Sequence, residues 1–172
     1  MRLLFEIDKK DYDPGGSVFA RHSARCIHIR NGLVAMVHSL KYDYYKFPGG
    51  GIEDGESKES AMIREAREEA GLVVIPESVR AYGYVHRIQK SDCGDAECFL
   101  QDNFYYLCEV EGQVQPQTLD AYEADEKFTL EYVAPEKAIF VNRNADHGPS
   151  DQTMLEREAG VLELLMAEGY FR

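Results

Sequence analysis

The chain has 172 residues, of which 44% are hydrophobic and 29% are charged, a balance that is typical of a folded globular domain and excludes intrinsic disorder. Its formal net charge of −12 at pH 7 disfavours binding to a nucleic-acid backbone, which requires clustered lysines and arginines. We therefore expect no nucleic-acid polymer as a partner. Small phosphorylated substrates remain compatible with this charge, because a bound divalent cation inverts the local field.

No apolar run approaches the ~20 residues that span a bilayer, and acidic residues occur too early in the chain for a secretory signal. The sequence therefore predicts a cytoplasmic protein without a membrane partner. Cys26 and Cys108 lie in apolar segments and are expected in the core. Cys93 and Cys98 lie in a polar, turn-rich stretch. Because no second cysteine pair has zinc-like spacing, we expect these two to be free thiols.

The predicted strands are short and rich in β-branched and aromatic residues. They cover residues 3–7, 23–30, 33–38, 73–75, 79–88, 103–110 and 128–133. Asn31 and Gly32 separate the second strand from the third. This dipeptide favours the positive φ angles of a type I′ turn and therefore predicts a β-hairpin.

Three segments have helical patterns. Residues 57–70 predict a helix that begins after the N-cap Ser57 and ends at Gly71. Residues 135–139 predict a short helical turn, and apolar residues recur at helical spacing over residues 153–172. Strands combined with separated helices indicate an α/β domain, in which helices cover a mixed sheet.

No linker or repeat divides the sequence, so we expect a single domain over residues 1–172. Residues 1–20 form a short N-terminal extension in this interpretation, and residues 153–172 form a C-terminal helix. The strand in the extension is a candidate for pairing across a homodimer.

The helix over residues 57–70 carries an arrangement of acids that folding does not require. Glu65, Glu68 and Glu69 project within a sector of roughly 100°. Glu65 and Glu69 are an i,i+4 pair of like charges, which costs roughly 0.2–0.5 kcal/mol, and the helix dipole also disfavours anions in this half. Mg²⁺ takes oxygen ligands and would reverse that cost. The preceding loop, Gly49-Gly50-Gly51, allows the backbone to approach such an ion.

The segment over residues 50–72 resembles the box of the Nudix hydrolase family. It reads Gly50, five residues, Glu56, seven residues, Arg64-Glu65-Ala66, one residue, Glu68-Glu69, one residue, Gly71-Leu72, and Phe47-Pro48-Gly49-Gly50 leads into it. The resemblance implies a Nudix-like α/β/α sandwich with a mixed β-sheet between helices. It also implies hydrolysis of the pyrophosphate bond in a nucleoside diphosphate derivative, such as a nucleotide, nucleotide sugar or dinucleotide, with Mg²⁺ or Mn²⁺ as cofactor.

The resemblance also implies roles for individual residues. The metal ligands would be Glu65, Glu68, Glu69 and the carbonyl of Gly50, with Glu68 or Glu69 as the catalytic base. Glu56 and Arg64 would form an ion pair that holds the loop against the helix, with Gly49 and Gly71 as further structural support. Family members often add an acid from a later segment. The candidates here are Glu126 as first choice, then Glu123, with Asp125 and Glu131 as alternatives.

The substrate is less constrained by the sequence. Arg21, Arg25 and Arg87 are candidates for binding phosphate, because a guanidinium offers paired donors, although an exposed surface arginine is the alternative for each. The proline of ADP-ribose hydrolases and the tyrosine of dinucleoside polyphosphate hydrolases are absent at their usual spacing after the box. The subfamily therefore stays unidentified.

Two other interpretations compete with a hydrolase. One is a catalytically silent module that keeps the fold and senses a nucleotide, which degenerate glutamates would favour. The other is a purely structural charged helix, which explains neither the glycine loop nor the spacing. All three box glutamates are intact, so the hydrolase is the preferred interpretation.

Overall fold

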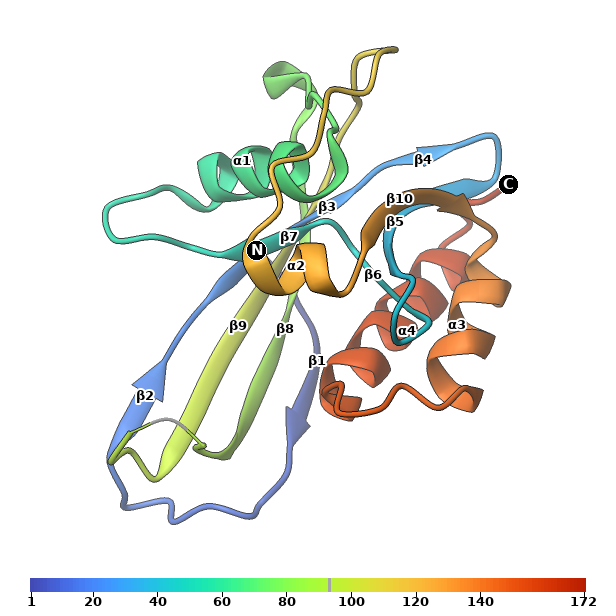
Figure 1. Cartoon of the computed structure of the whole chain (residues 1–172). Helices are drawn as coiled ribbons and strands as arrows, with labels where there is room; N and C mark the ends of the chain where they lie inside the picture. The colour runs from blue at the N-terminus through green and yellow to red at the C-terminus, as the bar shows by residue number, and fades with distance from the viewer. Residues whose placement is uncertain (93) are drawn as a thin grey trace.

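A computed structural model describes residues 1–92 and 94–172, so the prediction for Cys93 lies outside the described residues. Two β-sheets form the centre of the molecule (Figure 1). The larger sheet has the order β1-β8-β9-β3-β7, with β2 paired to β9. Its strands are β1 (Leu3–Asp8), β2 (Val18–Ala20), β3 (Ser23–Ile27), β7 (Gly49–Gly51), β8 (Arg80–Lys90) and β9 (Cys98–Leu107). The sheet is mixed, since β3 runs parallel to β9 and antiparallel to β7.

The smaller sheet is antiparallel and has the order β10-β5-β4, with β6 paired to β5. Its strands are β4 (Ile29–Arg30), β5 (Leu33–Ser39), β6 (Tyr44–Lys46) and β10 (Phe128–Val133). The predicted hairpin is present: Asn31 and Gly32 have φ angles of 53° and 74° between β4 and β5. The single strand predicted over residues 23–30 is instead divided at His28, where the chain passes from one sheet to the other.

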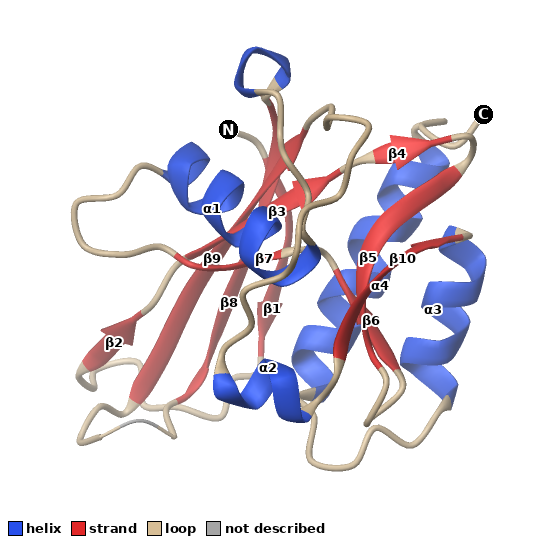
Figure 2. Ribbon diagram, turned by 45° about the horizontal axis from the view of Figure 1, so that its top comes forward, coloured by secondary structure: helices blue, strands red, loops and turns tan. Residues whose placement is uncertain are grey.

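Helices cover both sides of the sheets (Figure 2). They are α1 (Lys58–Ala70), the 3₁₀ turn η1 (Pro76–Ser78), α2 (Ala121–Asp125), α3 (Pro135–Asn144) and α4 (Gln152–Ala167). Alternate residues of β3 point to opposite layers, as the strand period requires. Cys26 packs in the apolar cluster that includes Ala66 of α1, whereas Ile27 packs in the cluster that includes Leu162 of α4. The predicted α/β class is therefore confirmed.

Several predicted boundaries shift. The C-terminal helix ends at Ala167, before the predicted residue 172, and the helical turn predicted over residues 135–139 continues to Asn144. Residues 73–75 contribute only an isolated bridge between Val74 and Val110. The sequence did not predict α2, which is a single short turn. Cys26, Cys98 and Cys108 are buried free thiols. Among the described residues, no helix is long and apolar enough to cross a membrane.

Candidate active site

Helix α1 forms for local reasons. The Ser57 hydroxyl caps its first turn by accepting a hydrogen bond from the Ser60 N–H (3.1 Å). Gly71 ends it in the left-handed region at φ 66°, which glycine adopts without strain. The helix buries its alanine face, including Ala61 and Ala66, against the sheets. This packing places Glu65, Glu68 and Glu69 of α1 beside the glycine strand β7.

The predicted ion pair between Glu56 and Arg64 is present. The Arg64 guanidinium donates to both carboxylate oxygens of Glu56, at 2.9 and 3.0 Å, and to the Gly51 carbonyl at 3.1 Å. These hydrogen bonds from Arg64 lower the pKa of Glu56 below its usual value. Paired guanidinium–carboxylate bonds combine strength with fixed geometry, so Arg64 ties the glycine loop to α1.

Glu65 and Glu68 lie on the same side of α1. Arg64 donates to Glu65 at 2.8 Å and to Glu68 at 3.2 Å. Burial raises the pKa of Glu65, and the hydrogen bond from Arg64 opposes that rise only in part. A Cβ atom at Gly50 would lie 2.5 Å from the Glu65 carboxyl group, so a side chain at residue 50 would force that carboxyl group to move. The glycine lets the loop backbone approach this carboxylate.

Glu69 makes different contacts. It is 1% exposed and accepts hydrogen bonds from the Lys46 ammonium (2.5 Å) and the Gly49 N–H (2.9 Å). Lys46 is itself 7% exposed and lies 4.8 Å from the centre of the Phe128 ring. Lys46 was not among the site residues predicted from the sequence. The available signal was its place as the one charged residue among residues 44–47, an apolar run that leads directly into the glycine loop.

An acidic cavity of about 400 Å³ opens beside α1. The carboxylates that line it are those of Glu53, Glu65, Glu68, Asp120 and Glu123. Arg21 and Arg64 are its lining cations, together with the backbone of Gly50 and Gly51. This surplus of carboxylates attracts positive charge.

The structure places the candidate later acids in different surroundings. Glu123 lies in α2, is buried, lines the acidic cavity and accepts a hydrogen bond from the Asp120 N–H (2.8 Å). Burial is the main cause of its raised pKa, and the charge of Glu69 adds to it. The first choice, Glu126, follows α2 and accepts hydrogen bonds from Ser39 (2.9 Å) and Tyr44 (2.7 Å). It is not among the described residues that line the cavity.

The two remaining alternatives point elsewhere. Asp125 pairs with Lys41 at the surface (2.6 Å). Glu131 accepts hydrogen bonds from Tyr45 (3.0 Å) and Lys137 (2.9 Å) on β10. Neither is among the described residues that line the acidic cavity.

The segment that carries Glu123 is fastened to the end of α1. The Gln115 N–H bonds to the Gly71 carbonyl and the Thr118 N–H to the Glu68 carbonyl, both at 2.8 Å. The Gln117 amide donates to the Glu69 carbonyl. These donors satisfy carbonyls that the last turn of a helix leaves unpaired. Residues 115–118 thereby hold the later acid in place relative to the box.

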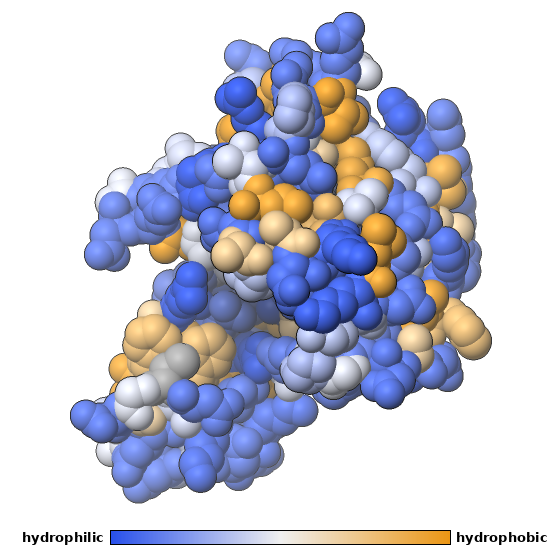
Figure 3. All heavy atoms as spheres, in the orientation of Figure 1, coloured by the Kyte–Doolittle hydropathy of each residue, from blue (hydrophilic) through white to orange (hydrophobic). Residues whose placement is uncertain are grey.

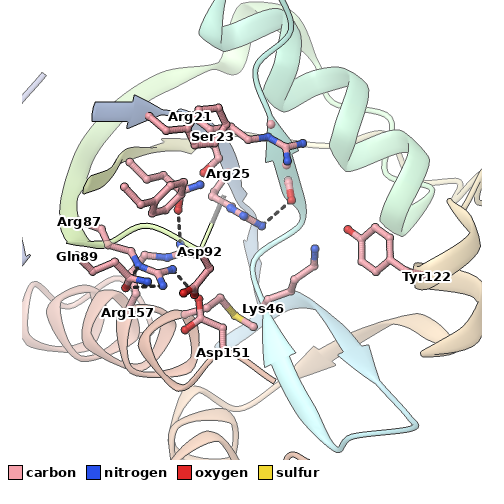
Figure 4. A pocket seen from close by; sticks show the side chains of 17 residues that line it. Arg21, Ser23, Arg25, Lys46, Arg87, Gln89, Asp92, Tyr122, Asp151 and Arg157 are labelled. Carbon is pink, nitrogen blue, oxygen red and sulfur yellow. Dashed lines mark hydrogen bonds and ion pairs between the residues drawn. The ribbon is translucent and has the colours of Figure 1, made fainter. Parts of the chain in front are cut away.

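A second cavity, of about 430 Å³, adjoins the acidic one and is lined by basic residues. It shares Arg21, Gly50, Gly51 and Tyr122 with the acidic cavity. Its basic lining residues are Arg21, Arg25, Lys46, Arg87 and Arg157, which Figure 4 shows around one space. All three arginines that the sequence analysis named for phosphate binding are therefore brought together. We refer to this space as the arginine cavity.

The arginines differ in how they are held. Arg25 donates to the Gly49 carbonyl (2.5 Å), and its buried Nε has no hydrogen-bond partner among the described residues. Arg87 is paired with Asp151 (2.6 Å) and donates to Gln89. On the molecular surface, Figure 3 shows a hollow between the end of the larger sheet near β2 and the part that carries α2.

A buried polar network borders the arginine cavity through Arg157. Arg157 and Glu158 of α4 are both fully buried. Arg157 donates to Glu158 (2.8 Å) and to Asn103 (2.6 Å), and Glu158 accepts the Phe47 N–H (2.7 Å). Burial acts to raise the pKa of Glu158, but the charges of Arg157 and Arg25 outweigh it and hold that pKa below its usual value. The network fixes α4 to the residues that lead into the glycine loop.

The acid groups suit a hard divalent cation, although they do not yet form a ligand set. Within residues 1–92 and 94–172, no three His, Cys, Asp or Glu side chains are gathered so that they could hold a metal ion as they stand. Arg64 holds Glu65 and Glu68, and Lys46 holds Glu69. Carboxylate oxygens beside an accessible backbone carbonyl are nevertheless the donors that Mg²⁺ and Mn²⁺ prefer. The chemistry of these donors therefore fits such an ion, which would take the place of Arg64 and Lys46 at the carboxylates.

Comparison with known proteins defines the family. The family model described as the NUDIX domain matches residues 20–157. The chain therefore belongs to the NUDIX domain family, as the box indicated. It is 32% identical over 117 residues to the RNA pyrophosphohydrolase of Acinetobacter baylyi, covering 61% of this chain and 69% of that protein. It is 34% identical over 91 residues to an RNA pyrophosphohydrolase of a Shewanella species, covering 49% of this chain and about half (52%) of that protein.

Solved structures agree on the fold. A structure from a study of MutT of Aliivibrio salmonicida and Vibrio cholerae matches with a TM-score of 0.55 and 20% identity, over 87% of this chain and 99% of that one. The Escherichia coli ORF135 protein matches with a TM-score of 0.53 and 20% identity, over 88% and 94%. The predicted Nudix-like α/β/α sandwich is thereby confirmed. The domain and the named relatives together support pyrophosphohydrolase activity for this chain.

Proposed function

We propose that this chain hydrolyses the pyrophosphate bond of a nucleoside diphosphate derivative with the aid of Mg²⁺ or Mn²⁺. The observation that carries the proposal is the junction of two cavities of opposite charge. Glu65, Glu68 and Glu123 line one, basic residues line the other, and Gly50 and Gly51 belong to both. Carboxylates suit a divalent cation and guanidinium groups suit phosphate, so a diphosphate has partners on both sides of the junction.

Each residue has a proposed task. Glu65, Glu68, Glu69 and the Gly50 carbonyl would hold the metal, which neutralises diphosphate charge and acidifies the attacking water. Glu123 replaces Glu126 as the later acid in this proposal, because its carboxylate lines the acidic cavity and can accept a proton from that water. Either Glu68 or Glu69 would be the base if Glu123 serves only as a ligand.

The choice between the later acids leads to a first prediction. Glu123→Gln is expected to lower kcat by roughly 10²-fold or more, because it removes a carboxylate that lines the acidic cavity. Glu126→Gln is the matched control and is expected to leave kcat within about threefold, since the Glu126 carboxylate accepts hydrogen bonds from Ser39 and Tyr44 and is not among the described residues that line the acidic cavity. Steady-state kinetics with saturating Mg²⁺ measures both variants. A larger loss of kcat in Glu126→Gln than in Glu123→Gln would assign the catalytic role of the later carboxylate to Glu126.

Arg21 leads to a second prediction, because it lines both cavities. Hydrogen bonds to charged groups contribute about 1.5–3 kcal/mol, so Arg21→Gln is expected to raise KM by roughly 10- to 100-fold. A smaller change in kcat would mark Arg21 as a residue that binds ground state and transition state alike. The control is Arg30→Gln, because the Arg30 guanidinium carbon lies 4.6 Å from the centre of the Tyr132 ring. Arg30 is not among the described residues that line either cavity. An unchanged KM for Arg21→Gln would remove Arg21 from the substrate site.

The substrate itself is decided by a release assay. Products are measured for nucleoside triphosphates, nucleotide sugars, dinucleotides and an RNA with a 5′-triphosphate, with Mg²⁺ or Mn²⁺. The RNA is included because the relatives in Acinetobacter and Shewanella are RNA pyrophosphohydrolases. The net charge of −12 favours the small molecules. Turnover of RNA alone would refute the small-molecule part of the proposal. Tight binding without turnover would favour a nucleotide-sensing module.

Three further expectations stay predictions from the sequence. They are a cytoplasmic location, the absence of a membrane partner and a homodimer formed through the N-terminal strand. The single domain over residues 1–172 is likewise proposed, since the family match ends at residue 157 within α4.

A further inference from the structure

The ion pair between Lys46 and Glu69 joins the lining of the arginine cavity to helix α1. Glu69 belongs to α1, whose neighbouring residues Glu65 and Glu68 line the acidic cavity, and Lys46 lines the arginine cavity. Both side chains are almost fully buried, and their charged atoms lie 2.5 Å apart. The pair therefore connects the proposed metal ligands with the proposed phosphate site.

The contacts of Glu69 leave little room for another cation. One carboxylate oxygen accepts from the Lys46 ammonium and the other accepts from the Gly49 N–H. A divalent ion bound to Glu69 would lie within a few ångströms of the ammonium, where like charges repel strongly in a buried environment. The ion and Lys46 therefore compete for the same carboxylate.

Lys46 has an alternative place for its charge. Its long, flexible side chain already lines the arginine cavity, beside Arg25 and Gly49. A phosphate group in that cavity would give the displaced ammonium a new anionic partner. A phosphate in the arginine cavity would thus replace the Glu69 carboxylate as the anionic partner of the Lys46 ammonium.

We propose that Lys46 is a built-in competitor for the divalent cation at Glu69 and that, once displaced, it turns into the arginine cavity and binds a substrate phosphate. The inference rests on the proposed function, since it requires a metal at the box glutamates. It makes metal and substrate support each other's binding through one side chain, and such coupling is reciprocal. A fixed structural ion pair would produce no coupling.

The first test measures Mn²⁺ binding by electron paramagnetic resonance at pH 8 without substrate. Lys46→Gln is expected to bind Mn²⁺ about tenfold more tightly than the unmodified chain, because the competing charge is gone. Lys46→Arg keeps the charge and is expected to bind no more tightly than the unmodified chain. Equal or weaker binding by Lys46→Gln would overturn the inference.

The same assay separates this inference from the proposed function. Glu68→Gln is expected to weaken Mn²⁺ binding whether or not Lys46 competes with the ion, because it removes a proposed metal ligand. Glu68 is bonded to Arg64 and not to Lys46, so this variant leaves the Lys46–Glu69 pair in place. If Mn²⁺ binding does not depend on Glu68, the proposed metal site itself is refuted. If it depends on Glu68 but not on the charge of Lys46, only the competition is refuted.

A second test uses the unmodified chain and needs no variant to fold. Acetylation of lysines by an amine-reactive ester is followed by mass spectrometry, with the exposed Lys137 as internal reference. Mn²⁺ is expected to raise the labelling of Lys46 several-fold relative to Lys137, and inorganic phosphate is expected to lower it again. Constant labelling while Mn²⁺ binds would overturn the displacement, and no protection by phosphate would overturn the second position of the ammonium.

Discussion

Glu68→Gln is expected to lower Mg²⁺-dependent turnover by about 10²- to 10⁴-fold while it changes the free energy of unfolding by less than ~0.5 kcal/mol. The side chain of Glu68 is 41% exposed, and its ion pair is the i,i+4 contact with Arg64. Removing this charge therefore costs the fold little. The carboxylate nevertheless lines the acidic cavity, where the metal and the attacking water are proposed to lie. Steady-state kinetics measures the loss of turnover, and urea unfolding of the same preparation measures the change in the free energy of unfolding.

Two further substitutions sharpen this experiment. Glu59→Gln removes an exposed acid from the first turn of the same helix and is expected to leave turnover unchanged. Glu69→Gln, the substitution that the sequence alone favours, is expected to destabilise the fold as well, because Lys46 loses its carboxylate partner. Glu68 therefore separates chemistry from stability better than Glu69 does. Unchanged hydrolysis in folded Glu68→Gln would refute the proposed mechanism.

Glu158→Gln is expected to reduce the free energy of unfolding by about 3–5 kcal/mol. The substitution leaves the fully buried Arg157 without its carboxylate, and an amide nitrogen cannot accept the Phe47 N–H. For a chain of this length, such a loss corresponds to a fall in Tm of roughly 6–20 °C. Urea unfolding at pH 7 measures the difference. The control is Glu156→Gln on the same helix, whose exposed pair with Arg143 is expected to contribute at most about 1 kcal/mol.

The same carboxylate predicts a dependence on pH. The pKa of Glu158 is lower in the folded chain than the usual value of about 4.3, so its ionised form stabilises the fold. That stabilisation is fully present above pH ~4.3 and is lost as the pH falls through the folded pKa. The stability difference between the unmodified chain and Glu158→Gln is therefore expected to be constant down to about pH 5 and to shrink at lower pH. A difference that grows in acid would contradict this assignment.

The parts of the site that the sequence predicted correctly are local in the chain. Glu56 and Arg64 are eight residues apart, and the helix period alone places Glu65 and Glu68 on one side. The hairpin at Asn31-Gly32 is equally local. For the box, the family resemblance added roles that no spacing could supply.

The parts that could not be predicted depend on contacts between distant segments. Lys46 meets Glu69 across 23 residues, and Arg157 meets Asn103 across 54 residues. The choice between Glu123 and Glu126 depends on tertiary contacts in the same way, since the two acids are only three residues apart and their surroundings differ through the position of α2. The apolar spacing over residues 153–172 predicted a helix, but it gave no sign that Arg157 is buried.

The hydrogen bonds between residues 115–118 and the end of α1 limit the distance between Glu123 and the box. Because Gln115 and Thr118 are bonded to backbone carbonyls at the end of α1, only five residues of chain, 119–123, separate this attachment from Glu123. Residues 111–114, just before this fastening, are exposed and lie outside that measured span. A related chain could therefore vary in length there without changing the span from Thr118 to Glu123, whereas one added residue within that span would move Glu123 away from its place in the acidic cavity.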